Sequence, residues 1–162
     1  DGELNKFDFK LNIDKMKDRL GNDFHLILKL HPAITSKETY SLNYPEFVLN
    51  LSDYPRMNDL LMVTDYLITD YSSIPFEFAF FKRPVIFYSY DLDSYKKNRG
   101  LISNYEVEVP GPIVRDTDEV INAILDFRFD LEGIREFYIQ WNQYSKGDSS
   151  KKLTQYILSG IK

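Results

Sequence analysis

The sequence predicts an α/β domain in which a parallel sheet is covered by helices on both faces. Short apolar runs, typical of buried strands, alternate with segments whose apolar residues recur at helical spacing. This alternation favours parallel βαβ units in a doubly wound sheet, and strands that are apolar throughout fit a sheet buried on both sides. A chain of 162 residues is long enough for one core, so we assign residues 1–162 to one domain.

The first part of the chain predicts a helix followed by a strand. Residues 1–10 form a polar lead-in, and apolar spacing predicts a helix between residues 13 and 20, with Gly21 placed to end it. Residues 24–30 form a strong strand signal. Pro32 forces His31 toward an extended conformation, so the strand ends there and the imidazole is held in a stiff context.

The middle of the chain predicts a second strand, a short helix and a central strand–turn–helix unit. Residues 33–46 are predicted as a loop with room for a short helix, residues 47–51 as a strand and residues 57–62 as a helix. The apolar run from Tyr66 to Thr69 predicts a buried strand. Pro75 is compatible with the first turn of a new helix, for which Ser72 or Ser73 is a suitable N-cap.

The remaining segments predict two more strands and three helices. We predict strands at 84–88 and 113–114, with a long polar and aromatic connection at 89–112 that is a candidate functional loop. A helix capped by Asp116 or Thr117 follows. Two further helices are indicated by apolar faces, which comprise Ile134, Phe137, Tyr138 and Trp141 in one and Leu153, Tyr156, Ile157 and Ile161 in the other.

Composition excludes several classes of protein. A net charge of −5 argues against a general nucleic-acid binder, and the absence of cysteine excludes disulfides and thiolate metal sites. No apolar run approaches the roughly 20 residues of a membrane span. The chain begins without Met in a charged stretch, and we expect it to be a piece of a longer protein.

Polar side chains follow two of the predicted strands. His31 comes just after one strand, and Asp70, Ser72 and Ser73 come just after another. Because ligands of α/β sheets bind at the carboxyl ends of the strands, these groups and a helix N-terminus are expected to face one crevice suited to the oxygens of a diphosphate. The alternative is a structural histidine beside two capping serines. A Ser-His hydrolase is disfavoured because no Gly-x-Ser-x-Gly elbow is present.

Other polar residues are candidates for the same crevice. Glu77 could accept hydrogen bonds from a ribose diol, or could merely complement the positive helix end, and Arg99 before Gly100 could reach a phosphate. Asp91-Leu92-Asp93 resembles the Asp-x-Asp metal site of some glycosyltransferases, but we assign no metal to it. Four tyrosines could form a wall for a base or sugar: Tyr88, Tyr90, Tyr95 and Tyr105.

Several ordered motifs together resemble the CDP-glycerol glycerophosphotransferase family, the teichoic acid primases and polymerases of Gram-positive bacteria. The resemblance covers roughly residues 25–160. The motifs that carry it are Leu28-Lys29-Leu30-His31-Pro32, the run from Asp59 through Thr69 to Glu77, the run from Pro84 to Tyr95, Arg99-Gly100, Pro110-Gly111-Pro112 and Gly147-Asp148-Ser149-Ser150.

The resemblance implies a GT-B fold of two Rossmann-like domains, of which this chain is the C-terminal, donor-binding one. It also implies that His31 acts on the donor diphosphate, that Ser72 and Ser73 hold the phosphates, that Glu77 takes the ribose and that Asp70 positions the turn.

The implied reaction transfers glycerol phosphate from CDP-glycerol, or ribitol phosphate from CDP-ribitol, to a lipid-linked or polymeric acceptor and releases CMP. No cofactor beyond the donor is implied. The missing N-terminal half would supply the acceptor side, a further histidine as base, and membrane contact at the inner face of the cell membrane, so this fragment alone is expected to be inactive.

Two other functions stay open at this point. A sialyltransferase-like GT-B enzyme that uses a CMP-sugar also pairs His-Pro with Ser-Ser, although the Asp-Leu-Asp-Ser-Tyr and Arg-Gly segments favour the glycerophosphotransferases. The other alternative is a CDP-binding module without catalytic activity.

Overall fold

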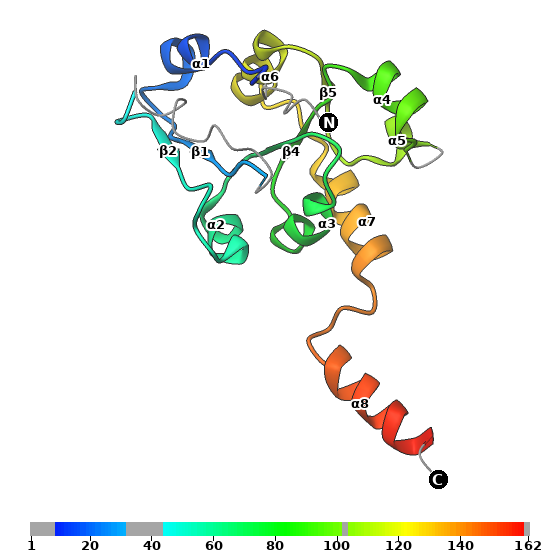
Figure 1. Ribbon diagram of the computed structural model, residues 1–162. Helices are drawn as coiled ribbons and strands as arrows, with labels where there is room; N and C mark the ends of the chain where they lie inside the picture. Colours follow the sequence, from blue (N-terminus) through cyan, green and yellow to red (C-terminus); the bar gives the residue numbers. More distant parts are fainter. Residues whose placement is uncertain (1–8, 32–43, 102–103, 161–162) are drawn as a thin grey trace, which may run out of the picture.

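The computed structural model describes residues 9–31, 44–101 and 104–160 and has the expected α/β architecture (Figure 1). The helices are α1 (Ile13–Leu20), α2 (Met57–Val63), α3 (Ile74–Phe78), the 3₁₀ helix η1 (Ala79–Phe81), α4 (Leu92–Asn98), α5 (Tyr105–Glu108), α6 (Thr117–Leu125), α7 (Leu131–Asn142) and α8 (Ser149–Gly160).

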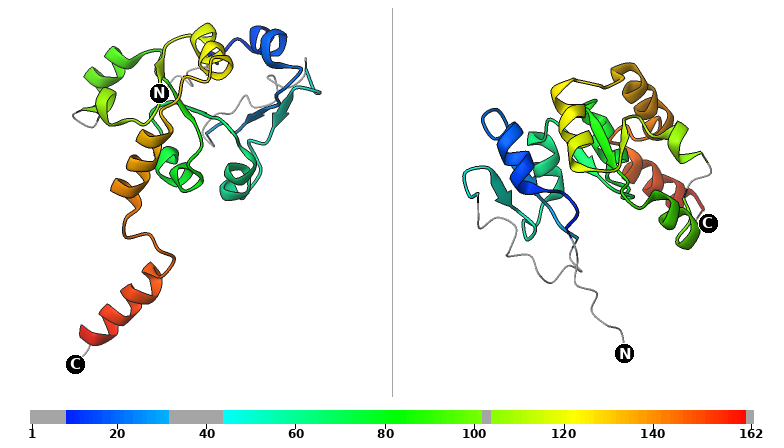
Figure 2. Two further views of the ribbon diagram at one scale, coloured as in Figure 1. Left: turned by 180° about the vertical axis from the view of Figure 1, so that it is seen from behind. Right: turned by 90° about the horizontal axis from the view of Figure 1, so that it is seen from above.

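The described strands all pair in parallel, as predicted, but they form two hydrogen-bonded groups. In one group, β1 (Leu26–Leu28) pairs with β2 (Val48–Asn50). In the other, the order is β3-β4-β5, with β3 at Leu67–Thr69, β4 at Val85–Tyr88 and β5 at Ile113–Val114. Helices α1 and α6 lie on one face of the strands and α2 and α3 on the other (Figures 1 and 2).

Strand β4 joins two hydrophobic clusters because its side chains alternate between opposite faces. Ile86 and Tyr88 belong to a cluster that includes Leu28 of β1 and Val120 of α6. Val85 and Phe87 belong to a second cluster, with Phe78 of α3. All four residues of β4 are buried, which is why the strand reads as a continuous apolar run.

The two strand groups are held together by packing between side chains. The Phe24 ring, just before β1, meets the Tyr66 ring, just before β3, edge to face with 5.8 Å between centroids. Helices α1 and α6 are linked by a hydrogen bond from the Asn12 amide to Thr117 Oγ1 (2.9 Å). The starts of β1 and β3 therefore lie side by side within one domain.

Helix α7 packs against the segment that follows β3. Its Phe137 ring stacks on Phe76 of α3, with 5.3 Å between centroids, and Asn142 Nδ2 donates to the Phe76 carbonyl (3.0 Å). Asp130 caps the start of α7 by accepting from the Glu132 and Gly133 amides. These contacts hold α3 against α7.

Helix α8 extends away from the body of the domain (Figures 1 and 2) and contains no buried residue. The apolar face predicted at Leu153, Tyr156 and Ile157 is exposed. In the parts of the chain that the structure describes, every helix is too short or too polar to cross a membrane.

Three other expectations need correction. The segment 89–112 is not a continuous loop, because α4 and α5 lie within it. The strand predicted at 24–30 keeps only three residues, because its pairing with β2 runs only from Leu26 to Leu28. Gly21 ends α1 with a right-handed φ of −65° rather than as a left-handed cap. The lead-in up to residue 8, the loop at 33–43, Pro32 and Ile161 lie outside the described residues.

Gly111 lies against the first residue of β4, where an added Cβ would be 2.0 Å from the Val85 carbonyl oxygen. We expect Gly111→Ala to lower the free energy of unfolding by about 1–3 kcal/mol in urea denaturation, because the lead into β5 must move. At Gly160, an added Cβ meets nothing within 4 Å, so Gly160→Ala is the matched control and should change stability by less than about 1 kcal/mol. Equal stability of the two variants would contradict this packing.

Candidate functional site

The segment Asp70–Ser73, which we call the serine turn, joins the end of β3 to the start of α3. Asp70, Ser72 and Ser73 are all exposed. Ser72 Oγ accepts a hydrogen bond from the Ile74 amide (3.2 Å), whereas Ser73 occupies the N-cap position without a side-chain bond to the helix. The sequence predicted that either Ser72 or Ser73 caps α3. In the structure, Ser72 is the residue whose side chain makes the capping hydrogen bond.

Helix α3 contributes less to anion binding than the sequence suggested. It has five residues and passes into η1, which ends at Lys82 with a left-handed φ of 52°, so its dipole is small. In its first turn the Ile74 amide donates to Ser72, Pro75 has no N–H, and the Phe76 amide donates to the Ser73 carbonyl. The serine hydroxyls and the backbone of the turn itself are the donors that remain for a ligand.

Tyr71 links the serine turn to α4. Its hydroxyl donates to Asp91 Oδ1 at 2.8 Å, and its ring stacks on Tyr95 with 3.7 Å between centroids and 19° between planes. Burial, followed by the hydrogen bond to the Asp91 carboxylate, raises the pKa of Tyr71 above its ordinary value of 10.0. The phenol therefore stays protonated and acts as a donor.

A second contact between side chains, from Ser89 to Tyr105, lies at the carboxyl end of β4. Ser89 is fully buried; its amide donates to the Val114 carbonyl (2.8 Å) and its hydroxyl lies 3.3 Å from the Tyr105 hydroxyl. Burial raises the pKa of Tyr105. The sequence suggested Tyr105 as a pocket wall but gave Ser89 and Tyr71 no role; the one signal for Tyr71 was its place between Asp70 and Ser72.

The two carboxylates of Asp91-Leu92-Asp93 face different partners. Asp91 accepts from Tyr71, whereas Asp93 lies 3.9 Å from Arg115 Nη1 with its side chain 87% exposed. Among the described residues, no group of three or more acidic, histidine or cysteine side chains is arranged to hold a metal ion. The first carboxylate of the motif thus has a structural contact within the fold.

Arg99 ends α4, on the helix that carries Asp91 and Tyr95. Its amide donates to the Tyr95 carbonyl (2.9 Å), and its side chain is exposed. Glu77 lies in α3, four residues after Ser73, and is also exposed. Through Tyr71, the structure therefore joins the elements that carry Asp70, Ser72, Ser73, Glu77 and Arg99.

His31 lies beyond the end of β1 and is exposed. The segment before it is anchored: the Leu30 amide donates to Ser52 Oγ (3.2 Å), and Lys29 Nζ donates to the Ser52 and Tyr54 carbonyls. The adjacent starts of β1 and β3 support the expectation that His31 and the serine turn share one edge of the sheet. Their convergence on one ligand stays a prediction.

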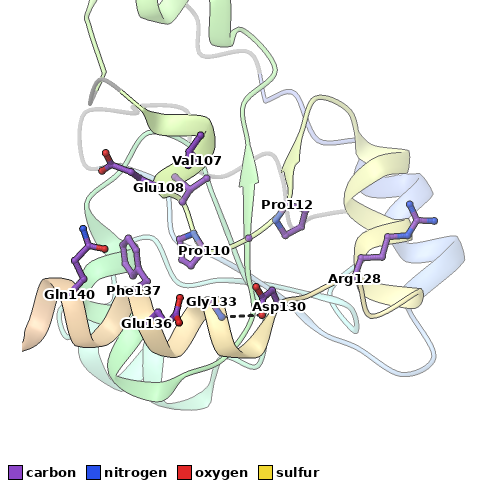
Figure 3. Close-up of a pocket in the computed structure, with 12 residues that line it drawn as sticks. Val107, Glu108, Pro110, Pro112, Arg128, Asp130, Gly133, Glu136, Phe137 and Gln140 are labelled. Carbon is purple, nitrogen blue, oxygen red and sulfur yellow. Dashed lines mark hydrogen bonds between the residues drawn. The ribbon is translucent and has the colours of Figure 1, made fainter.

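A cavity of about 520 Å³ lies elsewhere, between the lead into β5 and α7 (Figure 3). Pro110 and Pro112 line one side, and Asp130, Glu136 and Phe137 line the other. This is the amino edge of the sheet, because Pro112 precedes β5 and Gly111 touches the first residue of β4. None of the predicted site residues lines this cavity, so we do not assign the candidate site to it.

The sequence of this chain is similar to one protein family and to several of its members. A family model described as CDP-Glycerol:Poly(glycerophosphate) glycerophosphotransferase matches residues 2–159. The teichoic acid poly(glycerol phosphate) polymerase of Bacillus spizizenii is 39% identical over 157 residues, which cover 94% of this chain and 39% of the relative. The teichoic acid glycerol-phosphate primase of Bacillus subtilis is 39% identical over 89% of this chain and 37% of its own length.

The fold is also similar to that of a solved structure. The wall teichoic acid polymerase TagF matches 96% of this chain and 39% of its own chain, with a TM-score of 0.78 and 30% sequence identity. It is a GT-B protein, so the predicted α/β fold class is confirmed. The chain spans about two fifths of the length of these two relatives and of TagF.

Ser72 and Ser73 should differ in their effect on stability. We expect Ser72→Ala to lower the free energy of unfolding by about 0.5–1 kcal/mol, because the Ile74 amide loses its side-chain acceptor. Ser73→Ala is the matched control and should leave stability unchanged, since its hydroxyl does not cap α3. Thermal unfolding of the two variants tests this, and the reverse order would show that Ser73 is the functional cap.

The raised pKa of Tyr71 predicts a dependence of stability on alkaline pH. In the unfolded chain, Tyr71 loses its proton near pH 10, whereas in the folded chain it keeps the proton to higher pH. The folded state then binds more protons, so the free energy of unfolding falls as pH rises above about 10. In urea denaturation, the stability gap between wild type and Tyr71→Phe should narrow from about pH 8 to about pH 11. A stability gap that stays constant over this pH range would contradict the raised pKa of Tyr71.

Proposed function

Because the chain belongs to the CDP-Glycerol:Poly(glycerophosphate) glycerophosphotransferase family, we propose that it is the donor-binding half of a transferase that uses CDP-glycerol. The observation that carries the proposal is the family match across residues 2–159, which include the whole candidate site. A TagF variant soaked with CDPG adds support, since it is 31% identical over 94% of this chain.

In the proposed reaction, an acceptor hydroxyl attacks the β-phosphorus of CDP-glycerol. The new P–O bond joins glycerol phosphate to the acceptor, the bond to the bridging oxygen breaks, and CMP leaves with that oxygen. The acceptor gives its proton to a base, which we assign to the N-terminal part of the longer protein. Negative charge grows on the leaving phosphate, and donors already aimed at it lower the barrier; the loss of one such donor commonly costs on the order of 10²–10³ in rate.

The exposed polar residues have separate proposed roles. His31 neutralises the diphosphate or donates a proton to it, because an imidazole that carries a proton can do either. Ser72 and Ser73 donate hydrogen bonds to phosphate oxygens, and Asp70 sets the shape of the turn. Glu77 accepts from the ribose hydroxyls, and Arg99 reaches a phosphate from the end of α4.

The acceptor is proposed to be a teichoic acid chain or its lipid-linked primer, as the names of the relatives suggest. Its binding surface and the contact with the membrane are assigned to the N-terminal part, and the protein to the inner face of the cell membrane. The relatives include enzymes for two different alditols, glycerol and ribitol. The ribitol-phosphate polymerase TarK of Staphylococcus aureus is 35% identical, over 80% of this chain and 25% of its own length.

Two other functions are less well supported. A transferase that uses a CMP-sugar would share the histidine and the paired serines, but the family match favours a CDP-alditol. A CDP-binding module without catalytic activity would share the whole site, and would be distinguished by the absence of transfer when the chain is joined to the N-terminal part.

Calorimetry with CDP-glycerol tests the proposal. We expect His31→Ala and the double variant Ser72→Ala/Ser73→Ala each to weaken binding by roughly 10–100-fold, because each removes hydrogen bonds to a charged group. The melting temperature should stay nearly unchanged in His31→Ala, whose side chain is exposed, and should fall by only about 1–4 °C in the double variant, which loses the Ser72 cap. CDP-ribitol and CMP-sialic acid, titrated in parallel, distinguish the three donors.

The chain offers a matched control in its other histidine. His25 Nδ1 lies 3.1 Å from the Glu46 carbonyl oxygen, in the β1–β2 region, so His25→Ala should bind CDP-glycerol like the wild type. If His31→Ala also binds like the wild type, the histidine has no part in the donor site. If the wild type binds none of the three nucleotides, the donor-binding assignment is wrong.

A further inference from the structure

Three segments far apart in the sequence meet around one tyrosine. Tyr71 belongs to the serine turn, Asp91 is the N-cap residue of α4, Tyr95 lies within α4, and Tyr105 starts α5. The Tyr71 hydroxyl donates to Asp91 at 2.8 Å, and its ring lies flat against Tyr95 and 6.2 Å from Tyr105. The contact therefore joins the end of β3 to the segment that follows β4.

Tyr71 is held by the protein on both its polar and its apolar side. Its phenol donates to a carboxylate, which is a stronger bond than one between neutral groups, and a stacked aromatic pair adds about 0.5–1.5 kcal/mol beyond its buried area. The neighbouring residues Asp70 and Ser72 are exposed. The serine turn thus has one anchored residue between side chains that are open to a ligand.

The Tyr71–Asp91 contact lies at the start of α4. Asp91 is the N-cap residue of α4 but makes no side-chain bond to that helix; its carboxylate accepts from Tyr71 instead. Helix α4 ends at Arg99, whose amide donates to the carbonyl of Tyr95, the stacking partner of Tyr71. The positions of Ser72, Ser73 and Arg99 are therefore all linked to one contact.

We propose that Tyr71 is a positioning residue, whose bond to Asp91 holds the serine turn and α4 in the one arrangement that fits a nucleoside diphosphate. The inference rests on the proposed donor-binding function and extends it to two residues that do not touch the ligand. It also gives the Asp91 carboxylate a role, as the acceptor for Tyr71, whereas Asp93, two residues later, faces Arg115.

The proposal is tested with variants that each remove one functional group of the Tyr71–Asp91 contact. Tyr71→Phe keeps the stacked ring and removes the hydroxyl, and Asp91→Ala removes the acceptor. Asp91→Asn keeps an oxygen that can accept and should restore binding toward the wild type. Tyr144, with 80% of its surface exposed, supplies the matched control Tyr144→Phe.

We expect Tyr71→Phe and Asp91→Ala each to weaken CDP-glycerol binding in calorimetry by about three- to thirtyfold, and the double variant to be no weaker than either single variant, because both remove the same contact. Tyr144→Phe should bind like the wild type. Independent losses that multiply in the double variant, or unchanged affinity in Tyr71→Phe, would overturn the proposal.

Amide hydrogen exchange at residues 70–76, measured without ligand, separates this inference from the proposed function. Exchange there should be faster in Tyr71→Phe and Asp91→Ala, and unchanged in Tyr144→Phe. If the wild type fails to bind CDP-glycerol, the donor-binding function fails, and this exchange measurement still decides whether Tyr71 and Asp91 hold the turn. Equal exchange in all four proteins would show that they do not.

Discussion

The central strand β4 is the constraint on which the rest of the domain depends. It is paired on both sides, with β3 through Thr69 opposite Phe87 and with β5 through Val114 opposite Tyr88. Its alternate side chains enter two separate hydrophobic clusters. Because parallel strands deliver the chain to the same edge, this register places the serine turn beside Ser89 and the start of α4. The site is thus a consequence of how β4 is buried.

The sequence predicted the parts of this arrangement that local signals encode. The apolar run 85–88 and the Pro75 behind two serines identify a buried strand and the start of a helix directly. Helices α4 and α5 were missed, because each has only one buried residue, Leu92 and Tyr105, so neither shows an apolar period. Contacts with Tyr71 help to hold them in place, and a pairing between residues 71 and 91 leaves no periodic trace. The same reason hid the role of Asp91.

The exposure of the candidate site bears on how it could work. His31, Ser72, Ser73 and Glu77 are all open to solvent in this chain, and hydrogen bonds to phosphate are weak where water competes for both partners. Preorganised donors lower a barrier most in a site from which water is excluded. In the proposed two-domain enzyme, a second domain that closes over the carboxyl edge of the sheet would supply that exclusion.

The separation of α8 from the domain has a thermodynamic consequence. With no buried side chain, its 12 residues lie near the length at which an isolated helix is only marginally stable in water. In this chain on its own, α8 would take part in a helix–coil equilibrium that is independent of the core. Far-ultraviolet circular dichroism would then lose ellipticity gradually before the core melts, and would not coincide with tryptophan fluorescence, so a two-state fit to the dichroism alone would underestimate the cooperativity of the domain.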